Sequence, residues 1–142
     1  MNIVNDPFNE EQERIAQLLD KIFLAGQKKD FELLESYHLY SPKFSKFGLM
    51  PPLETQDANA SRQEERDAFS SFSEFHYHIQ DLKVSVFGPT AVSTFIANIR
   101  FSLGKQVVSK AVRSTLVFVK TDQNEWKIVH EHFSPYDKSK DK

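Results

Sequence analysis

The residues of this sequence that are best suited to chemistry lie in its C-terminal third. Arg113 stands inside an apolar segment that runs from Val112 to Val119, and Glu131 stands between His130 and His132. An arginine in an apolar strand must be paired or must line a cavity, because an isolated buried charge is expensive. We therefore expect Arg113 either to bind a carboxylate-bearing ligand through its planar guanidinium or to form an internal salt bridge with Glu131.

Glu131 is the candidate catalytic residue. Burial would raise its pKa, and a nearby Arg113 would lower it, so its environment decides whether it can carry a proton at neutral pH. A proton-transferring enzyme of the isomerase, cyclase or dehydratase kind would use Glu131 or a histidine as its acid or base. The alternative is that Glu131 belongs to a structural ion pair and does no chemistry.

The face on which Glu131 lies depends on one turn. A three-residue loop, Asp122–Asn124, with its last residue in the left-handed conformation, would set Glu131 and Phe133 beside Thr115. A two- or four-residue loop would instead bring in His132 and the other flanking histidine, because a one-residue slip reverses every side chain. We favour the three-residue loop, and we include Thr115, Phe133 and His132 among the candidate ligand-binding residues.

Two histidine pairs have a spacing that metal sites use. His76 and His78 share one face of a predicted strand, as do His130 and His132. The two pairs belong to the first and fourth strands of a meander, about 14 Å apart at the usual spacing of strands. We therefore expect no metal site and no cofactor.

The remaining candidate ligand-binding residues are polar side chains of a middle strand and aromatic side chains before the sheet. They are Asn98, Arg100, Tyr37, Tyr40 and Phe47, with Phe44 beside them. The alternative for the aromatic residues is an ordinary place in the core, since the chain contains thirteen phenylalanines.

These side chains need helices and strands to position them. Asn9 with Gln12 resembles a capping box that opens a helix to about Leu24, and apolar residues recur there at helical spacing. Asp30 is expected to cap a second, short helix, and Ser61 with Glu64 a third. Between the last two, residues 40–53 hold several prolines and many apolar side chains, which predicts an irregular lid packed on the domain.

From Phe75 the pattern changes to alternation and predicts an antiparallel meander. The expected strands are Phe75–Phe87, Thr90–Leu103, Gln106–Lys120 and Glu125–Ser134. The second and third strands carry apolar residues on both faces, whereas helices can cover only one. We therefore expect the other face to pack against a second copy of the chain, with ordinary exposed apolar surface as the alternative.

Composition restricts the class of protein further. The chain has 142 residues, a net charge of -2, a pI of about 6.2 and no cysteine. This balance lacks the basic surface of a nucleic-acid binder, and no apolar run is long enough to span a membrane. No signal peptide is predicted at Met1–Phe8. We expect one cytoplasmic domain over residues 1–142, with a core at about 10–135 and a solvated tail at 137–142.

The order of these elements, with Arg113-Ser-Thr115 leading to Trp126 and a closing His130-Glu-His-Phe-Ser134, resembles the nuclear transport factor 2-like superfamily. The resemblance is closest to SnoaL-like and ketosteroid-isomerase-like domains and to the association domain of calcium/calmodulin-dependent protein kinase II. It implies an α+β fold of the cystatin-like kind, in which a cone-shaped curved meander packs on three N-terminal helices.

The resemblance also implies a small-molecule ligand in a pocket inside the cone and a homodimer through the convex face of the sheet. Ketosteroid-isomerase relatives carry a general-base aspartate after the second helix, but the matching stretch Phe44–Gly48 contains no acid. Association domains place arginines in the pocket near the positions of Arg100 and Arg113. Three functions therefore stay open: ligand binding, proton-transfer catalysis, and assembly with a vestigial pocket.

Overall fold

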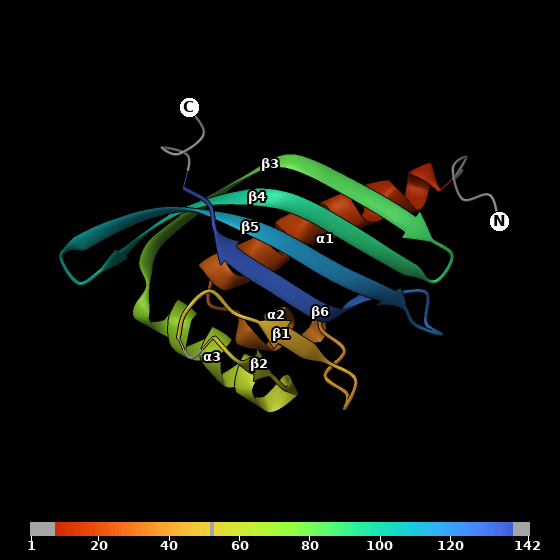
Figure 1. The fold of residues 1–142 in the computed structure, drawn as a ribbon, viewed down its shortest axis with the longest axis horizontal. Coiled ribbons are helices and arrows are strands. Elements are labelled where there is room, and N and C mark those ends of the chain that lie inside the picture. Colours follow the sequence, from red (N-terminus) through yellow and green to blue (C-terminus); the bar gives the residue numbers. More distant parts are fainter. Residues whose placement is uncertain (1–7, 52, 138–142) are drawn as a thin grey trace.

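The protein folds into a curved, unclosed sheet of six strands with helices on its concave side, as seen in a computed structural model that describes residues 8–51 and 53–137. The helices are α1 (Asn9–Gln27), α2 (Phe31–Ser36) and α3 (Ala58–Ser71), and the strands are β1 (Ser45–Phe47), β2 (Thr55–Gln56), β3 (Ser73–Phe87), β4 (Thr90–Leu103), β5 (Gln106–Lys120) and β6 (Trp126–Pro135). Figure 1 shows α1 running behind the long strands, with α2 and α3 closing the lower end. The predicted α+β fold is confirmed.

Local sequence explains the helices, although two of the three predicted caps are wrong. The side chain of Asp30 accepts a hydrogen bond from the Leu33 N–H, so the cap of α2 is confirmed. Helix α1 begins after Phe8 without a side-chain cap. Helix α3 is capped by Asp57, because its first turn starts earlier than the sequence suggested, and Ser61 lies buried inside it.

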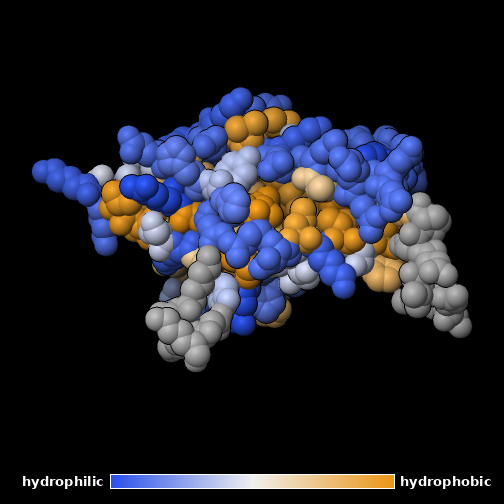
Figure 2. Space-filling model, turned by 90° about the horizontal axis from the view of Figure 1, so that it is seen from above, coloured by the Kyte–Doolittle hydropathy of each residue, from blue (hydrophilic) through white to orange (hydrophobic). Residues whose placement is uncertain are grey.

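The long strands follow their predicted bounds closely and form the meander β3-β4-β5-β6. Their inner face carries the core, including Phe95, Ala97, Leu116 and Phe118, which pack against the apolar stripe of α1. Figure 2 shows apolar surface at the projecting end of the β4–β5 hairpin, where Leu103 and Val107 are 40% and 56% exposed.

The segment predicted to be an irregular lid, residues 40–53, contains the strand β1, so that part of the prediction is wrong, and β2 follows just after it. β1 pairs in parallel with β6, with Lys46 opposite Glu131, and β2 pairs antiparallel with β1. Three residues are enough for this pairing because the prolines lie outside β1. The predicted tail lies outside the described residues except for Asp137, and so does nearly all of the N-terminal stretch.

No helix within the described residues is both long and apolar enough to cross a membrane.

Candidate functional site

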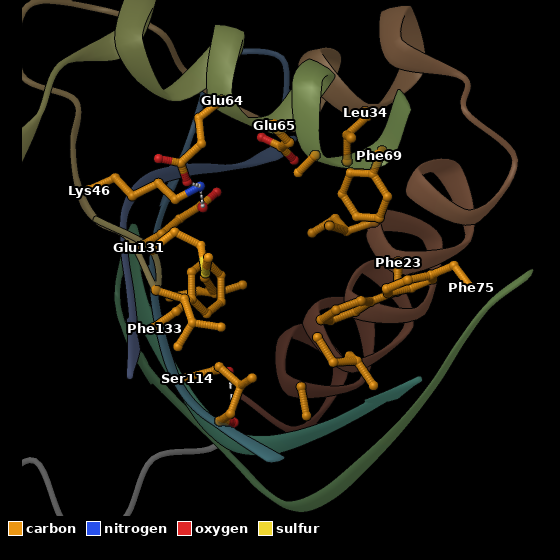
Figure 3. A pocket seen from close by; sticks show the side chains of 18 of the residues that line it. Phe23, Leu34, Lys46, Glu64, Glu65, Phe69, Phe75, Ser114, Glu131 and Phe133 are labelled. Atoms are coloured by element: carbon orange, nitrogen blue, oxygen red, sulfur yellow. Dashed lines mark hydrogen bonds and ion pairs between the residues drawn. The ribbon is translucent and has the colours of Figure 1, made fainter. Parts of the chain in front are cut away.

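A cavity of about 190 Å³ lies between the concave face of the sheet and the helices. Its walls are mostly apolar and include aromatic side chains from each side: Phe23, Phe69, Phe72, Phe75 and Phe133. Figure 3 shows this apolar space with charged side chains gathered at one end. The charged residues that line it are Lys46, Glu64, Glu65 and Glu131. An apolar cavity of about 150 Å³ can hold benzene, so this cavity has room for a small ring-containing molecule.

A bulge in the last strands turns Glu131 into this cavity. The turn before β6 has Asn124 at φ 63°, as predicted, and it aligns Lys120 with Trp126. Without interruption this register would set Glu131 opposite Thr115. The register shifts between Val117 and Phe118, so that Glu131 pairs with Leu116. Because residues of the pair share a face, Glu131 points inward with Leu116.

His38 forms a hydrogen bond with Glu131 and does not itself line the cavity. It follows α2 and forms an isolated bridge to Ile128. Its Nδ1–H donates to the Leu34 carbonyl at 2.9 Å, and its Nε2–H donates to Glu131 Oε1 at 2.5 Å. Burial lowers the pKa of His38, but the charge and hydrogen bond of Glu131 outweigh burial and raise the pKa to about 9. His38 is therefore an imidazolium at neutral pH.

Lys46 supplies a second cation to the same carboxylate. The parallel pairing of β1 with β6 brings its Nζ to 3.7 Å from Glu131 Oε2 and 3.5 Å from Glu64 Oε1. Burial raises the pKa of Glu131, yet the positive charges of His38 and Lys46 prevail and lower it to about 2. Glu131, only 4% exposed, thus stays ionised inside the protein.

Glu65 behaves in the opposite way. Burial, reinforced by the negative charge of Glu131, raises its pKa to about 7 even though His38 acts to lower it. Its Oε2 lies 3.8 Å from His38 Nε2 and has no hydrogen-bond partner within the described residues. Two carboxylates in one cavity therefore differ in protonation because one has two cations beside it and the other is mainly desolvated.

Tyr40 packs against His38. Its ring stacks on the His38 ring with a centroid separation of 4.9 Å and an interplanar angle of 2°. Burial, followed by the charges of Glu65 and Glu131, raises the pKa of the hydroxyl. The phenol therefore stays neutral and shields the ion pair from water without lining the cavity itself.

His38, Glu65 and Glu131 also offer one ligand atom each within 4.8 Å of one another, a grouping that could hold a metal ion. Charge compensation argues against this use. The Lys46 ammonium already faces Glu131, and a divalent ion would have to take the place of the proton shared by His38 and Glu131. The two predicted histidine pairs lie on β3 and β6, which β4 and β5 separate, so the expected separation is confirmed.

The placement expected for Arg113 is wrong. Its side chain is exposed on the outer face and donates to Ser134 Oγ at 3.2 Å. Thr115 pairs with His132 on that same outer face, away from the cavity, because the bulge separates both from Glu131. No salt bridge joins Arg113 to Glu131 among the described residues, and neither Asn98 nor Arg100 lines the cavity.

The predicted aromatic residues are divided between core and surface. Phe133 lines the cavity as expected. Tyr37 is half-buried and packs against the core. Phe47 is 40% exposed, and its ring lies 5.4 Å from that of His132, outside the cavity. The exposed His132 likewise does not line it.

The sequence did not indicate four ionisable residues in or beside the cavity: His38, Lys46, Glu64 and Glu65. A signal existed for one of them, because Lys46 stands in an aromatic and apolar stretch that contains no acid. The pattern of α3 gave no comparable signal, since its two glutamates look like the solvated side of a helix.

Comparison with known proteins identifies the family. A family model for the SnoaL-like domain matches residues 15–138, and the chain therefore belongs to that family. No functionally curated protein matches the sequence significantly. Among solved structures, the chain is similar to a proposed dehydratase of the NTF2-like family from Streptomyces avermitilis, with 23% identity, a TM-score of 0.80, and coverage of 91% of this chain and 98% of that one.

Two further structures share the fold. An NTF2-like superfamily protein from Salmonella enterica is 20% identical with a TM-score of 0.77, covering 90% of this chain and 92% of that one. The CaMKII hub from S. rosetta is also 20% identical, with a TM-score of 0.75 and coverage of 88% and 96%. Similarity at this level shows the fold, and the predicted relationship to NTF2-like and association domains is confirmed.

Proposed function

We propose that the cavity binds a small, mostly apolar molecule and catalyses a proton transfer on it. The observation that carries this proposal is the cluster of His38, Glu65 and Glu131 at the end of an apolar cavity. Buried ionisable groups are expensive in a purely structural role, and perturbed pKa values gather at functional sites.

The pKa values of Glu65 and Glu131 indicate a different role for each in the proposed reaction. Glu65, with a pKa of about 7, can give and take a proton at neutral pH and lines the cavity. Glu131, with a pKa lowered to about 2, is a weak base and serves as the fixed negative charge that positions His38 and Lys46. The acid–base role that the sequence suggested for Glu131 is therefore better filled by Glu65, and Glu131 stabilises positive charge in the cavity.

The charges in the cavity favour a neutral ligand. Among the described residues, three carboxyl groups, those of Glu64, Glu65 and Glu131, line the cavity together with the Lys46 ammonium, and the His38 imidazolium lies beside Glu131 without lining it. Arg113, which was expected to bind a carboxylate group, lies outside the cavity. His38 and Lys46 each already have a carboxylate partner, so these two described cations offer a carboxylate-bearing ligand no unpaired positive charge, whereas a neutral molecule with a polar end would be accepted. Isomerisation, cyclisation and dehydration all proceed by such proton transfers, and one structural relative is itself named a proposed dehydratase.

A thermal-shift screen with matched neutral and carboxylate-bearing aromatic compounds tests binding. Neutral compounds should stabilise the protein, by about 2.7 kcal/mol at a hundredfold their Kd. Ala97→Leu, which fills the cavity, should remove the response, and Ala111→Leu on the outer face should keep it. A response that survives Ala97→Leu, or a panel without any stabilising compound, would contradict the proposal.

Deuterium exchange tests catalysis without a known substrate. Compounds that bind are incubated with the protein in D₂O, and carbon-bound deuterium is measured by mass spectrometry. We expect exchange that Glu65→Gln slows by about 10²–10⁴-fold. Glu13→Gln, an exposed change on α1, is the control. Absence of exchange, or equal rates in both variants, would leave binding alone.

We also propose a homodimer through the outer face of β4 and β5. The supporting observation is that the outer face of these strands carries apolar side chains that one copy of the chain leaves only half-buried. They are Val92, Ile96, Val117 and Val119. Sedimentation at micromolar concentration should show a dimer, and a stable monomer would exclude it. An assembly module with a vestigial pocket would dimerise in the same way but would give no ligand response.

A further inference from the structure

The cavity has a second polar position at the end opposite its charged cluster. Ser114 lies on the inner face of β5 and is 4% exposed. Figure 3 shows it across the cavity from Glu64 and Glu65. Within the described residues that line the cavity, it is the one polar side chain without a charge. The surrounding wall is formed by apolar residues such as Val112 and Ala97.

The Ser114 hydroxyl has unused hydrogen-bonding capacity toward the cavity. Its Oγ–H donates to the Val112 carbonyl at 3.3 Å, a long bond. A hydroxyl carries one donor and two acceptor lone pairs, so the lone pairs of Ser114 remain available. A polar atom facing an apolar cavity is unfavourable unless it finds a partner, and a donor on a bound molecule would provide one.

The register sets the separation between the two polar ends. Ser114 pairs directly with Phe133, and Glu131 lies two residues before Phe133 in β6, on the same face. Such diagonal neighbours are about 7–8 Å apart. A six-membered ring with substituents at opposite positions spans a comparable distance, and the aromatic walls suit its faces.

We infer that the ligand is a ring-containing molecule with a hydroxyl group at one end, which donates to Ser114 Oγ, and a neutral polar group at the other end, which meets Glu65 and Lys46. This inference rests on the proposed function and specifies its ligand class. Ser114 would then determine specificity, since a site built to bond a hydroxyl discriminates against the analogue that lacks it.

The test uses 4-hydroxyacetophenone and 4-methylacetophenone as probes, because they differ only in a hydroxyl or methyl group of similar size. Dissociation constants are measured by calorimetry or ligand-observed NMR at pH 6.5. The wild-type protein should bind the hydroxyl compound roughly fivefold to tenfold more tightly. Ser114→Ala should erase this preference and leave the affinity for the methyl compound unchanged.

Ser93→Ala is the matched control. Ser93 is fully buried on the inner face of the sheet and does not line the cavity, so the variant should keep the wild-type preference. Equal binding of both probes to the wild-type protein, or a preference that survives Ser114→Ala, would overturn the inference about Ser114 alone. Binding of neither probe would also overturn it. In that case the screen with the wider panel shows whether the proposed function fails too.

Discussion

Charged residues on the two faces of the sheet have opposite environments, buried and paired on the inner face and exposed to solvent on the outer face. On the inner face, Glu131 is 4% exposed and contacts His38 and Lys46. On the outer face, Arg113 is exposed and donates to the hydroxyl of Ser134. A charge in water loses little when its partner is removed, whereas a buried charge depends on every partner. Residue type alone therefore did not reveal which charge could do chemistry.

The largest difference between the faces is expected for two neighbouring residues. Phe95 is 3% exposed in the core, whereas Ile96 is half-buried on the outer face. Phe95→Asp should unfold the protein, since it combines loss of a core aromatic, about 3–5 kcal/mol, with a buried unpaired charge. Ile96→Asp should leave a folded monomer.

Circular dichroism and sedimentation distinguish these outcomes. A folded Phe95→Asp protein would contradict the assignment of the inner face. An Ile96→Asp protein that remains dimeric would show that the outer face is not the interface.

The second comparison concerns the two charges themselves. Glu131→Leu should destabilise the protein by about 3–5 kcal/mol, because it leaves His38 and Lys46 as buried cations without their shared partner. Arg113→Leu should change stability by no more than about 0.5 kcal/mol. Urea unfolding of both single variants and the double variant measures these values. The effects should add, since the two residues share no partner; coupling above about 0.5 kcal/mol would contradict this arrangement.

The pH dependence of stability should reflect the inner face. The pKa of His38 in the folded protein, about 9, exceeds its ordinary value of 6.5. Its contribution is therefore fully present below pH 6.5 and is lost as the pH rises through 9, with a decrease of about 1–3 kcal/mol. Glu65, whose pKa is raised to about 7, loses its contribution as the pH rises from 4.5 to 7. Glu131, lowered to about 2, loses its contribution as the pH falls from 4.5.

Stability should accordingly be greatest near pH 4.5 and should decline as the pH rises, first through the loss of the Glu65 contribution and then through that of His38. Denaturant midpoints measured from pH 4 to 10 give this profile. His38→Gln should flatten its alkaline part, whereas His132→Gln on the outer face should not. A profile that rises toward pH 9 would exclude a protonated His38.

A small effect on stability is also expected for Glu65→Gln. Because Glu65 already holds a proton much of the time near pH 7, a neutral amide of the same shape should change the free energy of unfolding by less than about 1 kcal/mol. The variant should be slightly more stable than the wild type above pH 7, where ionising Glu65 is unfavourable. A loss of several kcal/mol, measured by urea unfolding at pH 8, would indicate that Glu65 is an ionised structural partner.

Local patterns determined most of the fold. Alternation from Phe75 onward gave the four long strands and their order, and the apolar residues at helical spacing gave α1. Asn124 gave the last turn, because few residues other than glycine tolerate a positive φ. These features depend on neighbours in sequence, which is why the sequence alone was sufficient to predict them.

The site was decided by the tertiary structure. Glu131 lines the cavity, but Arg113, which was expected to share its face, does not, because a bulge near Val117 places the two residues on opposite faces. A bulge leaves little mark in the sequence, yet it reverses the orientation of every later side chain. Lys46 reaches Glu131 through a three-residue parallel strand that no periodicity could reveal.

His38 and Glu131 are 93 residues apart in the chain and are joined by a short hydrogen bond. Each is ordinary in its local sequence: one follows a short helix, and the other alternates within a strand. Their pKa values diverge from ordinary values only because folding removes both from water and places them 2.5 Å apart. The sequence determined which elements form, whereas the pairing of distant elements determined which charges meet, because electrostatic interactions depend on distance and burial in space.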